Sequence, residues 1–175
     1  MRWGVVGHGR IVPKFLDAAR GVGHEVVAIV GRDPSRVAAF AAGHGISQAG
    51  IDPSGLVDEV DAVYVATPHS GHRDAALALL PAGVPVLCEK PMALNPEEAQ
   101  RMVDACDANG VKLMLCYYQR FNRRHQKIKE LIASGQIGKV TAARVTFSGF
   151  GPDNPRSWRQ KPELSGGGNL MDCGS

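Results

Sequence analysis

Short apolar runs alternate with segments of helical spacing over the first two thirds of the chain. Apolar runs of this length predict buried strands, and apolar residues three or four apart predict helices. The predicted strands cover residues 2–6, 25–30, 62–66, 84–88 and 112–116, and the predicted helices cover residues 10–20, 34–42, 72–80 and 96–109. Regular alternation of strands and helices is typical of a parallel sheet with helices on both faces. We therefore predict an α/β fold with a doubly wound parallel sheet.

The pattern changes after about residue 118. Residues 123–133 predict a helix, whereas residues 139–150 alternate between apolar and polar side chains like a half-buried strand. A single strand cannot form a stable sheet by itself. The sequence thus predicts a complete first domain at residues 1–118 and the incomplete start of an α+β second domain at residues 119–175.

Composition and charge narrow the class of protein. The hydrophobic fraction of 44% allows a packed core, and the net charge of +3 is too small to indicate nucleic-acid binding. No apolar segment reaches the roughly 18 residues of a membrane-spanning helix, and no signal peptide is evident. The four cysteines lack the C-x-x-C spacing of a zinc site, and three lie in apolar runs. We expect a cytoplasmic protein without a metal site or a membrane partner.

A glycine-rich turn lies between the first predicted strand and the first predicted helix. Gly7 would permit a sharp turn, Gly9 would leave room for a pyrophosphate, and the helix would direct its N-terminal N–H groups at the phosphates. The alternative is a plain structural turn. In this context we predict a Rossmann dinucleotide-binding domain, with contacts from Gly7, His8, Gly9, Arg10 and Ile11.

The residues after the second predicted strand bear on which dinucleotide binds. NAD sites carry an acidic side chain there, about 20 residues beyond the glycines, for the ribose 2′-OH. This chain has Gly31, followed by Arg32 with Arg36 nearby. A guanidinium can bind a 2′-phosphate, so the pattern favours NADP over NAD. Two alternatives remain: Asp33 is the ribose acid displaced by two positions, or Asp33 only caps the next helix.

Two further blocks follow predicted strands, where doubly wound sheets bind ligands. They are Ala66-Thr67-Pro68-His69-Ser70-Gly71-His72 and Glu89-Lys90-Pro91. In these blocks and in the glycine loop, the chain resembles the Gfo/Idh/MocA family of nicotinamide-dependent oxidoreductases. Four further motifs carry the same resemblance: Arg120-Phe121, Ser134-Gly135-x-Ile137-Gly138, Trp158-Arg159 and Gly166-Gly167-Gly168-x-Leu170-x-Asp172-x-Gly174. The resemblance covers the whole chain. It implies hydride transfer between a nicotinamide and a secondary alcohol or ketone of a sugar, polyol or cyclic diol.

The resemblance implies two catalytic residues. Lys90 would hold the substrate oxygen and stabilise a developing alkoxide, although most lysines are simply exposed on the surface. Asp172 resembles the carboxylate of the family's D-x-x-x-H pair, which orients an imidazole that moves the hydroxyl proton. The histidine of that pair would fall at position 176, and the sequence has 175 residues. Asp172 could therefore also be an ordinary acid on a helix surface.

The resemblance also implies cofactor contacts outside the glycine loop. Glu89 would lie against the cofactor ribose or orient Lys90, whose bond to Pro91 could be cis. The implied contacts are Thr67, Pro68, His69, His72, Glu89, Lys90, Arg120, Trp158 and Arg159. The structural alternatives are a packed histidine at a helix start for His72, a salt bridge or cap for Arg120, and a packed aromatic beside a solvated arginine for Trp158 and Arg159.

Two functions from different classes remain open. The first is an NAD(P)-dependent dehydrogenase or reductase that forms a homo-oligomer in its full-length form. The second is a non-catalytic NAD(P)-binding module. A methyltransferase is disfavoured by Glu89-Lys90-Pro91. Against the family pattern the chain reads as truncated early in its C-terminal domain, so we expect it to bind cofactor and to be a poor enzyme.

Overall fold

The computed structural model describes residues 1–146 and 157–174. The chain divides into one unit of Met1–Cys116 with Arg156–Ser175 and a second unit of Tyr117–Pro155. None of the helices within the described ranges is long and apolar enough to cross a membrane.

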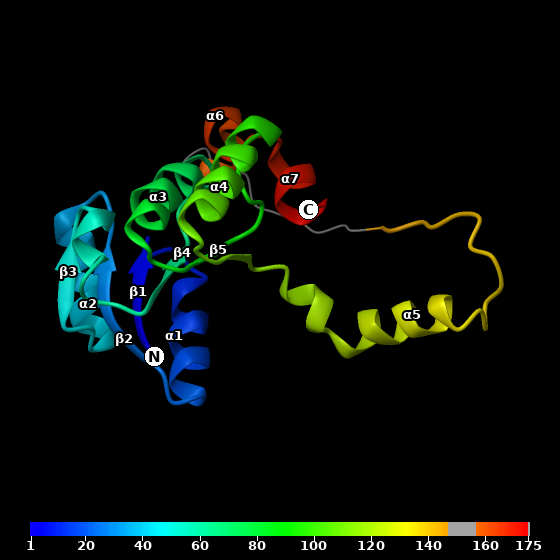
Figure 1. The fold of residues 1–175 in the computed structure, drawn as a ribbon, viewed down its shortest axis with the longest axis horizontal. Helices are drawn as coiled ribbons and strands as arrows, with labels where there is room; N and C mark the ends of the chain where they lie inside the picture. The colour runs from blue at the N-terminus through cyan, green and yellow to red at the C-terminus, as the bar shows by residue number, and fades with distance from the viewer. Residues whose placement is uncertain (147–156, 175) are drawn as a thin grey trace. The chain divides into compact units, whose positions relative to one another are not determined.

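A six-stranded sheet forms the centre of the first unit (Figure 1). Its strands are β1 (Arg2–Val6), β2 (Glu25–Val30), β3 (Gln48–Gly50), β4 (Ala62–Val65), β5 (Val86–Cys88) and β6 (Leu113–Leu115). They pair in the order β3-β2-β1-β4-β5-β6, and every pairing is parallel. The strand order reverses between β1 and β4, the switch point at which doubly wound sheets bind ligands. The predicted α/β, doubly wound Rossmann fold is thereby confirmed.

Four helices cover the two faces of this sheet. They are α1 (Val12–Gly21), α2 (Pro34–His44), α3 (His72–Leu79) and α4 (Pro96–Asn109). One apolar cluster joins Val5, Ile29 and Tyr64 to Leu16 of α1 and Val37 of α2, and the other joins Val6, Val30 and Val65 to Leu79 of α3 and Met102 of α4. Because successive strand residues point to opposite faces and both faces are covered, the buried parts of β1, β2, β4 and β5 are nearly continuous apolar runs.

Short helical segments complete the fold. They are the 3-10 turns η1 (Pro53–Leu56), η2 (His69–Gly71), η3 (Leu80–Ala82), η4 (Tyr118–Phe121) and η5 (Trp158–Gln160), and the helices α5 (Arg123–Ala133), α6 (Pro162–Ser165) and α7 (Gly168–Gly174). The segments η5, α6 and α7 belong to the first unit.

Side-chain caps decide where the longer helices begin. Asn95 Oδ1 accepts a hydrogen bond from Glu98 N at 2.8 Å, and Asp33 Oδ1 accepts one from Arg36 N at 3.2 Å. A proline occupies the first turn of both helices, and Gly45 and Gly110 end them in the left-handed conformation.

The predicted elements of residues 1–116 are all present, with ends that agree to within two residues. The strand β3, Gln48–Gly50, is not among the predicted elements, because this edge strand is only three residues long and contains no apolar run. Edge strands of this kind are recognised by their pairing rather than by their own residues. Here β3 pairs with Ala28–Val30 of β2.

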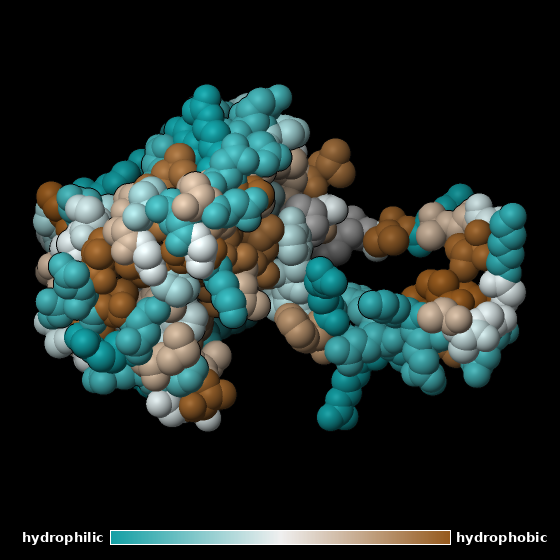
Figure 2. Space-filling view, viewed as in Figure 1, coloured by the Kyte–Doolittle hydropathy of each residue, from teal (hydrophilic) through white to brown (hydrophobic). Residues whose placement is uncertain are grey.

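The second unit contains α5, which spans the predicted residues. Asn122 Oδ1 caps it by accepting from Arg124 N at 2.9 Å. The strand predicted at residues 139–150 is not seen: residues 139–146 are not in a strand, and residues 147–150 lie outside the described ranges. Residues 139–146 pair with no strand among the described residues, and a strand is stabilised only by hydrogen bonds to a neighbouring strand. No side chain of residues 117–146 is fully buried, and Figure 2 shows hydrophobic surface along this unit.

Candidate active site

Asp172 of α7 is the centre of a cluster of basic side chains in the first unit. Lys90, directly after β5, donates from Nζ to Asp172 Oδ1 at 2.8 Å and also to the main-chain carbonyl of Asp172. Arg159 donates from Nε to Asp172 Oδ2 at 2.7 Å, and His69 Nε2 lies 3.7 Å from Asp172 Oδ1. The structure therefore brings together four residues that the sequence analysis selected from four separate blocks.

The electrostatics of this cluster keep Asp172 ionised. Its side chain is only 15% exposed, and burial alone would raise its pKa. The hydrogen bonds and positive charges of Lys90 and Arg159 outweigh burial and lower the pKa of Asp172 to about 2. The hydrogen bond from Lys90 to the carboxylate of Asp172 holds the Lys90 side chain in place near the end of the strand.

His69 packs behind this ion pair and is 2% exposed. Its Nδ1 lies 2.9 Å from the carbonyl oxygen of Ser165, which can only accept, so Nδ1 carries the proton. Burial lowers the pKa of His69. The Trp158 ring meets His69 edge to face at 4.6 Å, and the Arg159 guanidinium lies 4.5 Å from the centre of the Trp158 ring. The Trp158-Arg159 segment thus covers the cluster with an aromatic ring and a charge.

His72 begins α3 and is completely buried. Its Nδ1 lies 2.7 Å from the carbonyl of Pro91, and its Nε2 lies 3.1 Å from the carbonyl of Thr67. The Lys90–Pro91 peptide bond is cis. His72 therefore joins the loop after β4 to the turn that carries Lys90, and its ring nitrogens contact main chain.

Glu89 is held by a residue that the sequence analysis missed. The hydroxyl of Tyr64 donates to Glu89 Oε1 at 2.8 Å, and Lys90 N donates to Glu89 Oε2 at 3.2 Å. Tyr64 is opposite Leu87 in the β4–β5 pairing, so its side chain lies on the same sheet face as Glu89, two residues further along. In the sequence, this contact is indicated only by the hydroxyl of Tyr64, the one polar group among the side chains of an apolar strand.

The glycine loop fits a bound pyrophosphate. Gly7 has a φ of 102°, and a Cβ there would lie 2.7 Å from the carbonyl oxygen of Ala66, so packing alone requires glycine. A Cβ at Gly9 would meet its nearest atom, the same oxygen, at an ordinary 3.7 Å. Ile11 precedes α1 and makes no side-chain cap. In the first turn of α1, Val12 N donates to the carbonyl of Gly9 at 3.0 Å, Pro13 has no N–H, and Lys14 N donates to the carbonyl of Ile11 at 3.1 Å. An anion at this loop would therefore meet the N–H groups of the turn that precedes α1. Arg10 is exposed in this loop.

The end of β2 carries the residues that bear on the adenosine ribose. Asp33 Oδ1 accepts from Ser35 Oγ at 2.8 Å and from Arg36 N at 3.2 Å, so Asp33 caps α2. These hydrogen bonds lower the pKa of Asp33. Arg32 and Arg36 are exposed. A Cβ at Gly31 would lie 2.9 Å from Val37 Cγ2, so this position has no space for a side chain.

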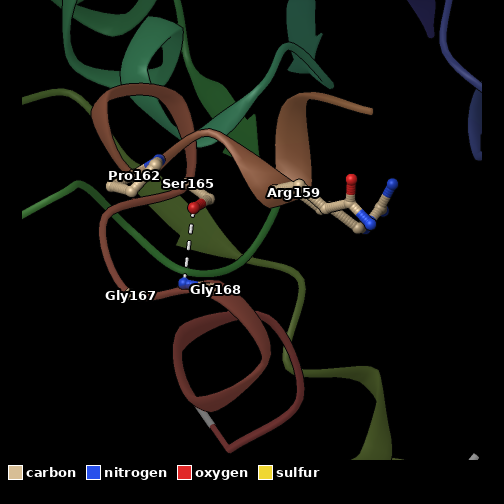
Figure 3. A pocket seen from close by; sticks show the side chains of 6 residues that line it. Arg159, Pro162, Ser165, Gly167 and Gly168 are labelled. Atoms are coloured by element: carbon tan, nitrogen blue, oxygen red, sulfur yellow. Dashed lines mark hydrogen bonds between the residues drawn. The ribbon is translucent and has the colours of Figure 1, made fainter. Parts of the chain in front are cut away.

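The remaining predicted residues occupy varied places. Pro68 immediately precedes η2, and Thr67 Oγ1 is buried without a hydrogen-bond partner among the described residues. Arg120 is exposed in η4 of the second unit. A cavity of about 400 Å³ is lined by Arg159, Gln160, Pro162, Ser165, Gly167 and Gly168. Figure 3 shows the side chains that line it. Ser165 Oγ there accepts at 3.3 Å from the main-chain N–H of Gly168, the first residue of α7.

Comparison with known proteins agrees with this arrangement. Residues 1–117 match the model of the Gfo/Idh/MocA oxidoreductase family with an NAD-binding Rossmann fold, and residues 125–175 match a C-terminal domain model of the same family. The 1,5-anhydro-D-fructose reductase of Ensifer adhaerens is 37% identical over 174 residues, which are 98% of this chain and 52% of that protein. The trans-1,2-dihydrobenzene-1,2-diol dehydrogenase of Mus musculus is 36% identical over 182 residues, 99% of this chain and 53% of that protein.

Solved structures give the same result. An aldose-aldose oxidoreductase from Caulobacter crescentus, complexed with glycerol, matches with a TM-score of 0.85 and 31% identity over 98% of this chain and 53% of its own. The WlbA dehydrogenase from Bordetella pertussis, in complex with NADH and UDP-GlcNAcA, matches with a TM-score of 0.72 and 35% identity over 78% of this chain and 43% of its own. The chain spans about half the length of the curated relatives that it matches. By fold and by sequence, it belongs to the Gfo/Idh/MocA family of oxidoreductases.

Proposed function

We propose that the protein is an NAD(P)-dependent dehydrogenase or reductase that transfers hydride between the nicotinamide and a secondary alcohol or ketone of a sugar, polyol or cyclic diol. The observation that carries the proposal is the contact of Lys90 with Asp172 at the C-terminal end of β5, beside the switch point of the sheet. The substrate class follows the relatives, which are named as a reductase of an anhydrosugar and a dehydrogenase of a cyclic diol.

Lys90 is proposed to hold the reacting oxygen. An ammonium group has three N–H donors, and the carboxylate and the carbonyl of Asp172 accept two of them. The third donor is available to a substrate oxygen, and the positive charge would stabilise the alkoxide that develops during the reaction. Asp172 orients Lys90 and remains ionised. The nicotinamide, when bound, supplies or accepts the hydride.

The proposed cofactor contacts begin at the glycine loop, where Gly9 and the main-chain N–H groups of the turn before α1 would receive the pyrophosphate. Arg32 and Arg36 at the end of β2 would receive a 2′-phosphate, because Asp33 is engaged as a helix cap. We therefore propose NADP as the preferred cofactor, with NAD second. The other proposed contacts are Gly7, His8, Arg10, Ile11, Thr67, Pro68, His69, His72, Glu89, Lys90, Arg120, Trp158 and Arg159.

The cell compartment, the assembly and the domain division also remain proposals. The four cysteines are unpaired, which supports a location in the reducing cytoplasm.

We propose a homo-oligomer for the full-length protein, without nucleic acid or membrane partners. The domains are proposed as residues 1–118 and 119–175.

Titration with NADPH and NADH, followed by an assay of polyols, aldoses and cyclic diols, tests the proposal. We expect the fluorescence of NADPH to change on binding, and oxidation or reduction of at least one substrate class. Binding without turnover for any substrate would favour a non-catalytic binding module instead. No binding of either nucleotide would contradict both functions.

A further inference from the structure

The imidazole of His8 fills the position at which NAD-selective sites carry their acidic side chain. A Cβ built at Gly31 would lie 3.0 Å from His8 Nδ1 and 3.4 Å from His8 Cε1. The other side of the same position is closed by Val37 Cγ2 at 2.9 Å. The His8 ring also faces Phe40 of α2, with 6.2 Å between the ring centres. His8 therefore reaches from the phosphate loop to the end of β2.

The ring also presents an unused polar atom at this position. Nδ1 of His8 is buried and has no hydrogen-bond partner among the described residues. A buried imidazole nitrogen without a partner is unfavourable unless a ligand or water satisfies it. Burial lowers the pKa of His8, the charge of Arg36 lowers it further, and the charge of Asp33 opposes both. These two residues of the α2 start are the charged groups that act on the ring.

We propose that His8 is a specificity-determining residue for the adenosine ribose of the cofactor and selects for the 2′-phosphate of NADP. The proposal rests on the dinucleotide binding proposed above. His8 excludes a side chain at position 31, which removes the usual partner of a ribose 2′-OH. When a phosphate binds, an N–H of the imidazole donates to one of its oxygens, and the negative charge of the phosphate favours the uptake of a proton by the ring.

The pH dependence follows from this proton uptake. A phosphate beside the ring raises the pKa of His8 above its value in the free protein. Between the pKa of His8 in the complex and its pKa in the free protein, the affinity for NADPH should therefore rise as the pH falls. The affinity for NADH should not rise in this pH range. The 2′-phosphate itself titrates near about pH 6, so the comparison must be made between variants at the same pH.

The test measures dissociation constants of NADPH and NADH from pH 5.5 to 8.5 for the chain and for His8→Ala, His8→Asn and His44→Ala. We expect His8→Ala to lower the preference for NADPH over NADH about tenfold. We compare the two proteins by the ratio of wild-type to His8→Ala affinity for NADPH, because the titration of the phosphate affects both affinities equally and cancels in the ratio. This ratio should rise towards low pH. His8→Asn keeps a donor without a titrating ring, so it should retain part of the preference with a flat ratio.

His44→Ala is the matched control. His44 contacts the same Phe40 ring, at 4.3 Å between ring centres, and a Cβ at Gly31 has no His44 atom among its nearest neighbours. It should leave the NADPH preference and its pH profile unchanged. An unchanged preference in His8→Ala would overturn the proposal for His8, whereas a wild-type chain that binds neither nucleotide would instead overturn the proposed function.

A second measurement covers the case in which the variants fail to fold. The ring resonances of His8 in the wild-type chain are followed by NMR during titration with adenosine 2′,5′-bisphosphate and with 5′-AMP. A shift towards the imidazolium form with the bisphosphate alone supports the proposal. No change with the bisphosphate, under conditions in which it binds, overturns it.

Discussion

The ammonium nitrogen of Lys90 lies 2.8 Å from Oδ1 of Asp172, although 82 residues separate the two along the chain. Lys90 lies two residues beyond β5, the strand next to the edge strand β6, and Asp172 belongs to a helix of the same unit. The ion pair fixes the position of the Lys90 ammonium group near the C-terminal end of β5, and a positioned N–H donor is what the polarisation of a carbonyl or the stabilisation of an alkoxide requires.

Replacing Lys90 by alanine should abolish turnover and spare cofactor binding. We expect kcat to fall by about a thousandfold, because one charged donor to a developing oxyanion is worth that much. The dissociation constant of NADPH should change by less than about threefold, since Lys90 is expected to touch the reacting end only. Steady-state kinetics with the best substrate and NADPH titration check this. Unchanged turnover would remove Lys90 from the mechanism.

Asp172 should make the stability of the fold depend on pH in the acid range. Its pKa is about 2 in the folded chain, below the ordinary aspartate value of 3.8 that applies once the chain unfolds, so folding stabilises the ionised form. The contribution, about 2 kcal/mol, is fully present above about pH 4 and is lost as the pH falls through 2. Urea denaturation from pH 2 to 7 should show this slope in the wild-type chain and a shallower one in Asp172→Asn. Asp17→Asn, which removes an exposed carboxylate on α1, is the control and should leave the slope of the wild-type chain nearly unchanged. Equal slopes in wild type and Asp172→Asn would contradict the assignment.

Tyr64→Phe should weaken the support of Glu89 without disturbing the core. The hydroxyl is removed, but the ring that stacks on Phe15 at 4.1 Å between centres is kept. Burial and the charge of Glu89 raise the pKa of Tyr64, so its hydroxyl stays a donor, and its loss should cost about 1–2 kcal/mol of unfolding free energy. Denaturant titration measures this, and Tyr64→Leu, which also loses the stacking, should cost more. A Phe variant as stable as the wild type would show that the hydrogen bond contributes nothing.

Gly7→Ala and Gly9→Ala should separate folding from binding. At Gly7 the positive φ and the 2.7 Å approach to Ala66 predict a loss of about 2 kcal/mol or more of stability. At Gly9 the nearest contact is 3.7 Å, so stability should change by less than about 1 kcal/mol, while NADPH binding weakens because the methyl group enters the phosphate site. Thermal denaturation and NADPH titration of both variants test the pair. Equal effects of the two substitutions on stability would refute this division.

Arg32→Ala should weaken NADPH binding about tenfold more than NADH binding, because only NADPH carries the 2′-phosphate that the guanidinium would pair with. Arg101→Ala, an exposed arginine on α4, removes the same charge at a different place and is the control. Titration of both nucleotides at low and moderate salt measures the effect. Equal losses for NADPH and NADH would refute the phosphate role of Arg32.

The sequence by itself was sufficient for five of the six strands of the sheet and for the four helices that cover it. Buried strands such as residues 25–30 are continuous apolar runs because both sheet faces are covered, and helices such as residues 96–109 carry their own caps. Such signals are local, so they can be recognised along the chain. The glycine of the turn at Gly7 is equally local, since its positive φ admits little else.

Only the tertiary structure decided what lies against these elements. The short edge strand β3 and the absence of a strand at residues 139–146 depend on the presence or absence of a pairing neighbour, which no local pattern records. The same holds for three contacts: the hydrogen bond from Tyr64 to Glu89, the approach of the His8 ring to Gly31, and the bonds of Asp172 with Lys90 and Arg159. Each of these contacts joins side chains that are distant in sequence, and their strength comes from burial and charge that exist only once the chain has folded.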